Sequence, residues 1–117
     1  MLYFESRGGA IQFEWDDKKN TLNRIKHDGS FELASFVFHD PLIISIPDHR
    51  YSYGEERWQS IGAVDGIVIY VAHMVEEDEH DKEIIRIISA RAATQNEERR
   101  YYSQCRDETR IKRVKKT

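Results

Sequence analysis

Apolar and polar residues alternate from Ile11 to Trp15, and this period of two predicts a short opening strand. Asp16-Asp17 follows and suits the N-terminus of a helix, where carboxylates meet backbone N–H groups that have no partner within the helix. A helix that continues to about Asp28 would place Leu22 and Ile25 toward the core, because they are three residues apart on one helical face.

A second helix is predicted directly after the first. Gly29 can end the first helix in the left-handed conformation, and Ser30 can cap the next one. Asp40-Pro41 terminates the second helix, because the residue before a proline avoids helical backbone angles. The apolar residues between these signals are the predicted core positions: Phe31, Leu33, Ala34, Val37 and Phe38.

The second half of the chain has the period and the turn signals of strands. Asp65-Gly66 is the strongest hairpin signal, since its two residues tolerate the positive φ that a tight hairpin turn requires. Ile67–Val75 is apolar on both faces and is therefore predicted to be a central strand, and Glu76–Lys82 is predicted to be an acidic loop. The other predicted strands are Leu42–Ile46, Arg57–Val64 and Glu83–Ser89.

Thr94-Gln95-Asn96-Glu97 has the form of a capping box and predicts a last helix that runs to about Cys105. The order along the chain is then one strand, two helices, an antiparallel four-strand meander and a C-terminal helix. This order predicts an α+β fold in which helices cover one face of a curved sheet, because each element must bury its apolar side.

The 117 residues fit a single domain with a modest core. Residues 1–9 join no clear pattern and are interpreted as an N-terminal extension, either native or an expression remnant. Residues 10–104 form the predicted domain, and residues 105–117 a basic tail. The sequence has no apolar run of membrane length and no signal-peptide pattern. Cys105 is the only cysteine, which excludes an internal disulfide and favours the reducing cytoplasm.

Charge is distributed unevenly along the chain. The net charge is −3, but the tail carries six basic and two acidic residues and residues 1–9 are neutral overall, so residues 10–104 carry −7. An acidic body argues against broad, non-specific nucleic-acid binding, which depends on Lys and Arg contacts with phosphates. Any RNA contact is therefore expected at a local basic site or in the tail.

Gly54–Trp58 places two carboxylates, a guanidinium and an indole in four consecutive positions, Glu55, Glu56, Arg57 and Trp58. Metal-independent RNA cleavage needs a base for the 2′-OH proton, a cation at the scissile phosphate and often an aromatic ring that stacks on a base. The alternative interpretation is an exposed strand edge with a cross-strand ion pair and a core tryptophan. On this segment alone the alternative is favoured.

Arg86 interrupts the strongly apolar run Ile84–Ile88 and must face solvent, a carboxylate or an anionic ligand. Arg91 follows shortly after, and Arg99-Arg100 lies on the last predicted helix, so these cations could hold a phosphate. A structural salt bridge to Glu55 or Glu56 explains Arg86 about as well.

Lys26-His27 ends the first predicted helix, where a cation favours the helix dipole. For Lys26 this structural explanation is preferred, whereas His27 could equally be a general acid or base. The five histidines are scattered, and no zinc spacing, phosphate loop or nucleophile elbow is present, so no metal site or cofactor is predicted. His80 lies within the acidic loop, which is interpreted as a solvated charge run and not as a cation site.

The ordered set of motifs resembles BrnT-type toxins over roughly residues 11–102. The resemblance implies a RelE-like fold and a cytoplasmic bacterial toxin that cleaves RNA and halts translation. It implies a BrnA-like antitoxin with a ribbon-helix-helix region, and contact with operator DNA only through that antitoxin. The motifs are Phe13-Glu14-Trp15-Asp16 with Lys19-Asn20, Lys26 to Phe31, Val37 to Pro41, Gly54 to Trp58 with Ile61-Gly62, Ile85 to Thr94, and Glu97, Arg99, Arg100 and Tyr102.

The resemblance also implies a set of site residues. The catalytic candidates are His27, Glu55, Glu56, Arg57 and Arg86, and the RNA-binding candidates are Lys26, Trp58 and Arg91. The chain departs from the family pattern at Asp28, which lengthens Lys-His-Gly to Lys-His-Asp-Gly, and in the acidic loop Glu76–Glu79. The alternative function is a non-catalytic, antitoxin-binding co-repressor that keeps the toxin fold.

Overall fold

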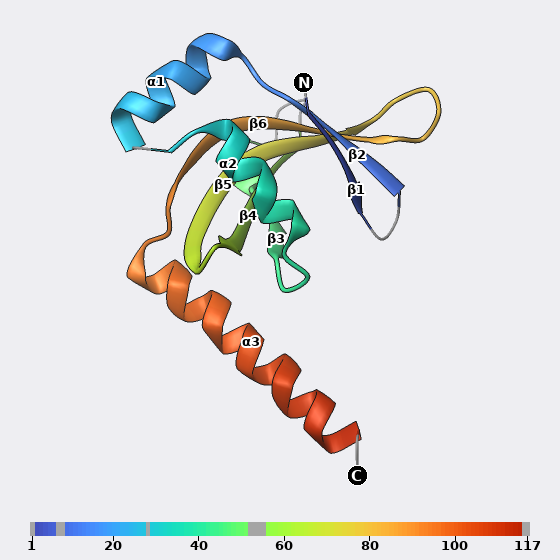
Figure 1. Ribbon diagram of the computed structural model, residues 1–117, viewed down its shortest axis with the longest axis vertical. Helices are drawn as coiled ribbons and strands as arrows, with labels where there is room; N and C mark the ends of the chain where they lie inside the picture. The colour runs from blue at the N-terminus through green and yellow to red at the C-terminus, as the bar shows by residue number, and fades with distance from the viewer. Residues whose placement is uncertain (1, 7–8, 28, 52–55, 116–117) are drawn as a thin grey trace.

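The computed structural model describes residues 2–6, 9–27, 29–51 and 56–115, with side chains placed in 11–27, 29–50 and 56–106 (Figure 1). The predicted α+β fold is confirmed. The elements are β1 (Leu2–Ser6), β2 (Gly9–Glu14), α1 (Asp17–His27), α2 (Phe31–Ser35), the 3-10 helix η1 (Phe36–His39), β3 (Ile44–Pro47), the 3-10 helix η2 (His49–Tyr51), β4 (Arg57–Val64), β5 (Ile67–Glu77), β6 (Glu83–Ala92) and α3 (Gln95–Lys115).

The strands form one mixed sheet in the order β1-β2-β6-β5-β4-β3. The predicted antiparallel meander of four strands is confirmed as β3 to β6. The opening strand β2 pairs with β6 in parallel, with Ile11 opposite Glu83. β1, to which the sequence pattern assigned no structure, pairs antiparallel with β2 at the edge of the sheet. This parallel pairing brings the start of the domain beside its last strand.

The hairpin at Asp65-Gly66 is confirmed. Asp65 has φ +50° and Gly66 has φ +81°, the pair of positive angles that a two-residue type I′ turn needs. The turn joins β4 to β5, and β5 lies between β4 and β6 as the predicted central strand. Burial of Val68, Ile69, Tyr70 and Val71 on both faces explains why this strand has no polar side.

One face of the sheet, here called the helix-packed face, carries the main core. α2 lies on β5 and β6, and η1 lies on β4 (Figure 1). The Ser30 cap is confirmed, because its hydroxyl accepts a hydrogen bond from Leu33 N at 3.1 Å. The prediction that Leu33 is a core residue is wrong, since its side chain is exposed. The core residues are Ile11, Phe13, Phe31, Ala34, Val37, Ile69, Val71, Ile85, Ile87 and Ala90, with Phe38 partly buried against them.

The prediction that Leu22 and Ile25 point inward from α1 is also wrong, because both are exposed. The buried residues of α1 are Asn20 and Asn23. β2 pairs with β6 only as far as Arg86, so the later part of β6 has an edge without a strand beside it. The Asn23 amide takes the place of a strand there: it donates to Ala90 O at 2.8 Å and accepts from Ala90 N at 3.2 Å. Hydrogen bonding, and not apolar burial, therefore decides which side of α1 faces the sheet.

The prediction that the helices share one face of the sheet is wrong for α3, which packs on the opposite face. Tyr101 of α3 joins a second core cluster with Ile61, Val68 and Tyr70, residues that alternate with those of the helix-packed face. The Tyr101 hydroxyl donates to the Asp40 carboxylate, and Asp40 also accepts from Ala63 N at 2.8 Å. α3 then runs away from the sheet to Lys115, further than the expected end near Cys105 (Figure 1).

Candidate active site

Four residues line up across the sheet on the face opposite α2. Arg57 of β4 is in register with Met74 of β5, Met74 with Arg86 of β6, and Arg86 with Glu14 of β2. Paired residues of neighbouring strands point to the same face, so the two arginines share this face with the carboxylate. Two strand spacings, roughly 10 Å, separate the backbones of Arg57 and Arg86. We call Arg57, Met74, Arg86 and Glu14 the arginine row.

Glu14 belongs to this row although sequence reasoning did not select it. Arg86 Nη1 lies 3.8 Å from Glu14 Oε2, and Gln12 Nε2 donates to Glu14 Oε1 at 3.4 Å. The Arg86 side chain is 45% exposed and that of Glu14 30%, so the pair is loose, open to water and able to meet a ligand. The alternation along the chain was the available signal, because Gln12 and Glu14 are polar and alternate with Ile11, Phe13 and Trp15.

Arg57 is half-buried at the start of β4. Its carbonyl accepts a hydrogen bond from Asp48 N at 2.7 Å. The buried Asp48 carboxylate accepts from Arg50 Nε at 2.9 Å and Arg50 Nη2 at 2.8 Å. The Arg50 hydrogen bonds, followed by one from Gln59, hold the pKa of Asp48 well below its usual range. This anchor ties η2 to the start of β4, where Arg57 lies.

The structure separates Trp58 from the arginine row. Trp58 follows Arg57 on the same strand and therefore points to the opposite face, where it is in register with His73. A base stacked on Trp58 would meet the helix-packed side of the sheet. Glu56 is exposed directly before β4, and Glu55 lies outside the described residues.

Lys26 and His27 lie at the far end of α1 from Arg86. Asn23 contacts Ala90, which is four residues beyond Arg86 along β6. At about 3.3 Å per strand residue this is roughly 13 Å, and α1 continues past Asn23 in the same direction (Figure 1). Lys26 is exposed and His27 half-buried. The structure therefore does not bring these two residues to the arginine row.

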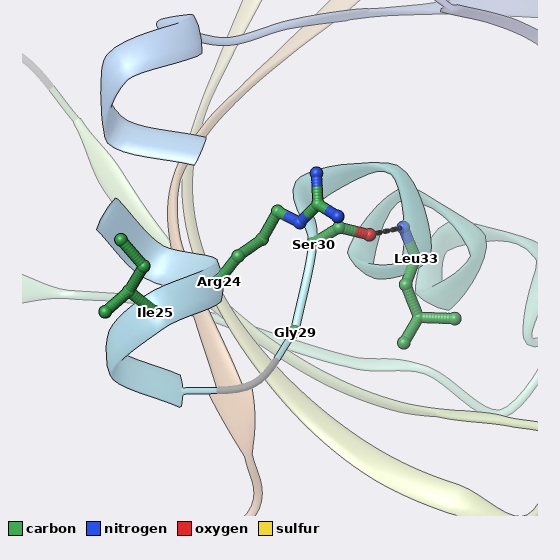
Figure 2. Close-up of a pocket in the computed structure, with 5 residues that line it drawn as sticks. All are labelled: Arg24, Ile25, Gly29, Ser30 and Leu33. Carbon is green, nitrogen blue, oxygen red and sulfur yellow. Dashed lines mark hydrogen bonds between the residues drawn. The ribbon is translucent and has the colours of Figure 1, made fainter. Parts of the chain in front are cut away.

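A pocket of about 470 Å³ lies between α1 and the start of α2 (Figure 2). No residue of the arginine row lines it. Arg24 extends from α1 toward Ser30, and Leu33 lies beyond them on α2 (Figure 2). The pocket therefore belongs to the helical side of the molecule. Its lining residues are Arg24, Ile25, Gly29, Ser30 and Leu33.

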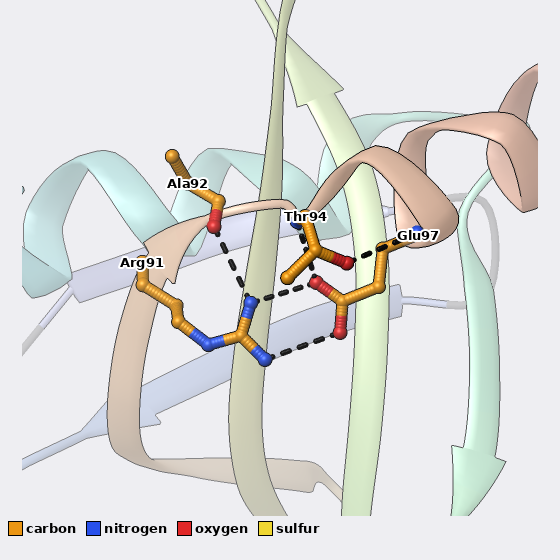
Figure 3. Close-up of polar contacts among 4 residues, drawn as sticks. All are labelled: Arg91, Ala92, Thr94 and Glu97. Atoms are coloured by element: carbon orange, nitrogen blue, oxygen red, sulfur yellow. Dashed lines mark hydrogen bonds and ion pairs between the residues drawn. The ribbon is translucent and has the colours of Figure 1, made fainter.

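Arg91 is held at the N-terminus of α3 (Figure 3). Its guanidinium forms a two-pronged pair with Glu97, with N–O distances of 2.7 and 3.1 Å, and lies 3.9 Å above the centre of the Tyr70 ring. Glu97 also completes the predicted capping box, accepting from Thr94 N at 2.9 Å while its own N–H donates to Thr94 Oγ1 at 3.2 Å. Burial opposes ionisation of Glu97, but the hydrogen bonds from Arg91 and Thr94 keep its pKa lowered. An RNA phosphate at Arg91 would compete with Glu97.

A hydrogen-bonded chain of Ser45, Ser60 and His73 crosses the helix-packed face. Ser60 Oγ lies 2.7 Å from Ser45 Oγ and 2.6 Å from His73 Nε2. His73 is 2% exposed, and burial lowers its pKa to about 4 against a smaller upward effect of the Met74 backbone. A substrate cannot reach this imidazole without unfolding the core around Phe38, whose ring centroid lies 4.9 Å from that of the imidazole. This chain is therefore part of the core.

Among the described residues, no three His, Cys, Asp or Glu side chains come together as a metal-ion site. In the acidic loop, Asp78 Oδ1 instead accepts hydrogen bonds from His80 N and Lys82 N, both at 2.8 Å, and so closes the turn between β5 and β6. None of the helices in the described part of the chain is long and apolar enough to cross a membrane.

Comparison with known proteins identifies the family of the chain. No curated protein matches the chain significantly. The family model of the ribonuclease toxin BrnT of type II toxin–antitoxin systems matches residues 15–97. That span covers most of the domain, including α1, α2 and β3 to β6 with Arg57 and Arg86. The chain therefore belongs to the BrnT family of ribonuclease toxins, whose systems pair each toxin with an antitoxin.

Proposed function

We propose that the chain cleaves RNA without a metal ion, and that the arginine row is the place of cleavage. The observation that carries the proposal is the register of Arg57, Met74 and Arg86 across three neighbouring strands, with the Glu14 carboxylate 3.8 Å from Arg86. Two guanidiniums on one face, with a carboxylate beside them, are the groups that metal-independent RNA cleavage needs.

In the proposed reaction the 2′-OH oxygen attacks the adjacent phosphorus, the P–O5′ bond breaks, and the products are a 2′,3′-cyclic phosphate and a 5′-OH. Arg57 and Arg86 hold the phosphate and neutralise the charge that develops on its oxygens. Glu14 accepts the 2′-OH proton, and a proton is delivered to the leaving 5′-oxygen from water or a protonated side chain. Glu55, Glu56 and His27 remain the sequence-based alternatives for moving these protons.

RNA contacts beyond the scissile phosphate are proposed at Lys26, Trp58 and Arg91. These three residues lie apart from the arginine row, so an RNA that reached all of them would have to pass around the sheet edge. The acidic body restricts binding to such local basic positions. We therefore propose that Arg57 and Arg86 bind the phosphate that is cleaved, and that Lys26, Trp58 and Arg91 affect affinity.

In the cell we propose that this cleavage occurs in the cytoplasm and inhibits translation. The antitoxin is proposed to be BrnA-like, with a ribbon-helix-helix region through which the pair contacts operator DNA. The second candidate function is a non-catalytic co-repressor. It is favoured by the ion pairs of Arg86 with Glu14 and of Arg91 with Glu97, which could serve structure alone. The loose, exposed Arg86–Glu14 pair gives the ribonuclease the stronger support.

The product chemistry tests the proposal. The purified chain is incubated with a labelled RNA in EDTA, and the same RNA is made with one 2′-deoxy nucleotide at the main cleavage position. We expect a 2′,3′-cyclic phosphate from the first RNA and no cleavage at that position in the second. Cleavage of the deoxy position would refute 2′-OH attack, and complete dependence on added divalent ions would refute metal-independent cleavage. Glu14→Gln should slow cleavage, while Glu98→Gln on exposed α3 should not.

A further inference from the structure

Four of the exposed large apolar side chains in the described part of the chain gather on one helical region. Leu22 is 65% and Ile25 79% exposed on α1, and Leu33 is 39% and Phe36 46% exposed on α2 and η1. Members of each pair are three residues apart, so each pair lies on one side of its helical segment. We call Leu22, Ile25, Leu33 and Phe36, with the pocket between the helices, the α1–α2 surface. Ile25 and Leu33 line the same pocket, and exposed apolar groups of this kind mark interaction sites in soluble proteins.

The exposure of Leu22 and Ile25 cannot be relieved by turning α1. Asn20 Oδ1 accepts from Phe31 N at 2.9 Å, and Asn20 Nδ2 donates to Glu32 Oε1 at 2.6 Å. Asn23, three residues further along the same side of α1, forms two hydrogen bonds with Ala90. A rotation that buried the apolar side chains would break these bonds and leave buried amides without partners. The apolar pattern of α1 is therefore satisfied by something other than the core of this chain.

The charge around this surface differs from that of the rest of the molecule. α1 carries four basic residues and one acidic residue, although the whole chain has a net charge of −3. Arg24 lines the pocket together with Ile25 and Leu33 (Figure 2). Lys26, which follows Ile25 in the sequence, is exposed. A complementary partner must place apolar side chains against the pocket and carboxylates near the surrounding cations.

We propose that the α1–α2 surface is where the antitoxin docks, through an amphipathic helix whose apolar side is flanked by acidic residues. The proposal rests on the toxin–antitoxin pairing of the family, and it adds the place of contact and the chemistry of the partner segment. Ile25 and Leu33 form the apolar contacts, and Arg24 binds a carboxylate at the pocket. Exposed aliphatic residues that line a pocket beside a cation are the kind of anchor on which a helix-in-groove interface depends.

This surface and the arginine row share no residue. The row lies on the face of the sheet opposite α2, whereas the α1–α2 surface is formed by the helical side of the molecule. Substitutions on the surface should therefore weaken antitoxin binding without changing RNA cleavage by the isolated chain. Substitutions in the row should slow RNA cleavage without weakening antitoxin binding. The two sets of variants therefore distinguish failure of the docking proposal from failure of the proposed ribonuclease activity.

The test uses the full chain and the antitoxin encoded by the reading frame adjacent to its own, mixed in an isothermal titration. Ile25→Asp is compared with Ile67→Asp, which changes another exposed isoleucine, at the hairpin between β4 and β5. We expect Ile25→Asp to weaken binding by about 100-fold or more and Ile67→Asp by less than about threefold. Arg24→Glu should weaken binding by about tenfold, and this loss of affinity should become smaller as the salt concentration is raised. Thermal unfolding of each variant shows that its fold is intact.

Equal affinity of the parent and Ile25→Asp would overturn the proposal, as would equal losses for Ile25→Asp and Ile67→Asp. Sedimentation tests a competing occupant, a second copy of this chain. That occupant is identified if the parent self-associates, if Ile25→Asp is monomeric, and if both bind the antitoxin with the same affinity. If the parent does not cleave RNA but binds the antitoxin through Ile25, the docking proposal stands and the ribonuclease proposal fails.

Discussion

Asn23 gives the sharpest test of how α1 is held. Its side chain donates to Gly29 O at 3.0 Å and to Ala90 O at 2.8 Å, and it accepts from Ala90 N at 3.2 Å. Ala90 is itself 3% exposed. Asn23→Ala removes all three hydrogen bonds and leaves both backbone groups of Ala90 without their partner at the edge of β6.

The cost follows from these buried groups. Each buried backbone donor or acceptor left without a partner costs about 1–3 kcal/mol. Some water can enter the space left by the amide and recover part of this loss. We therefore expect Asn23→Ala to lower the free energy of unfolding by roughly 2–4 kcal/mol, which for a domain of this size lowers the melting temperature by about 10 °C or more.

Urea unfolding measures this change directly, with Leu22→Ala as the matched control on the neighbouring position of α1. Leu22 is exposed, so its truncation should change the free energy of unfolding by less than about 0.5 kcal/mol. A leucine in a core would instead cost about 2–5 kcal/mol on truncation. A large loss for Leu22→Ala together with no loss for Asn23→Ala would refute the orientation of α1 and with it the α1–α2 surface.

Three further predictions concern stability. The pKa of His73 is about 4 in the folded protein and 6.5 in the unfolded chain. Its contribution to the free energy of unfolding is therefore complete above pH 6.5 and decreases by about 3 kcal/mol as the pH falls to 4, because the unfolded chain binds the proton more tightly. Urea unfolding against pH should show this decrease, and His73→Gln should flatten it. Glu97→Ala removes the capping box and the partner of Arg91, and should lower the free energy of unfolding by about 1–2 kcal/mol by the same assay. Gly62→Ala places a Cβ 2.8 Å from Val37 Cγ1 and should cost about 1–3 kcal/mol in thermal unfolding; no change would show that η1 moves away freely.

Local signals explain which parts of the fold could be predicted from the sequence. The Asp65-Gly66 turn, the Ser30 cap and the Thr94–Glu97 box act within a few residues, and each is present as predicted. The parallel pairing of β2 with β6 joins residues about 70 positions apart, and no short pattern encodes it. Leu22 and Ile25 have helical spacing but are exposed, because the Asn23–Ala90 hydrogen bonds set the rotation of α1.

The residues of the candidate site also divide into those that local sequence patterns identify and those that depend on pairing between distant strands. Arg57 and Arg86 could be selected singly, as a charge beside an aromatic and a charge inside an apolar strand, but their common face depends on the register through Met74. Glu14 enters the site only through the parallel pairing. Strand alternation, in contrast, could have separated Trp58 from Arg57, since neighbouring residues of a strand face opposite sides.

RNA cleavage by Arg86→Ala is the most direct test of the central claim that the arginine row is the active site. The purified parent and the variant are compared in EDTA, with Arg24→Ala as the control because Arg24 is an exposed arginine on α1, away from the row. We expect Arg86→Ala and Arg57→Ala each to cleave about 100-fold more slowly than the parent, and Arg24→Ala to cleave at the parental rate. Cleavage by a folded Arg86→Ala variant at the parental rate would contradict the claim.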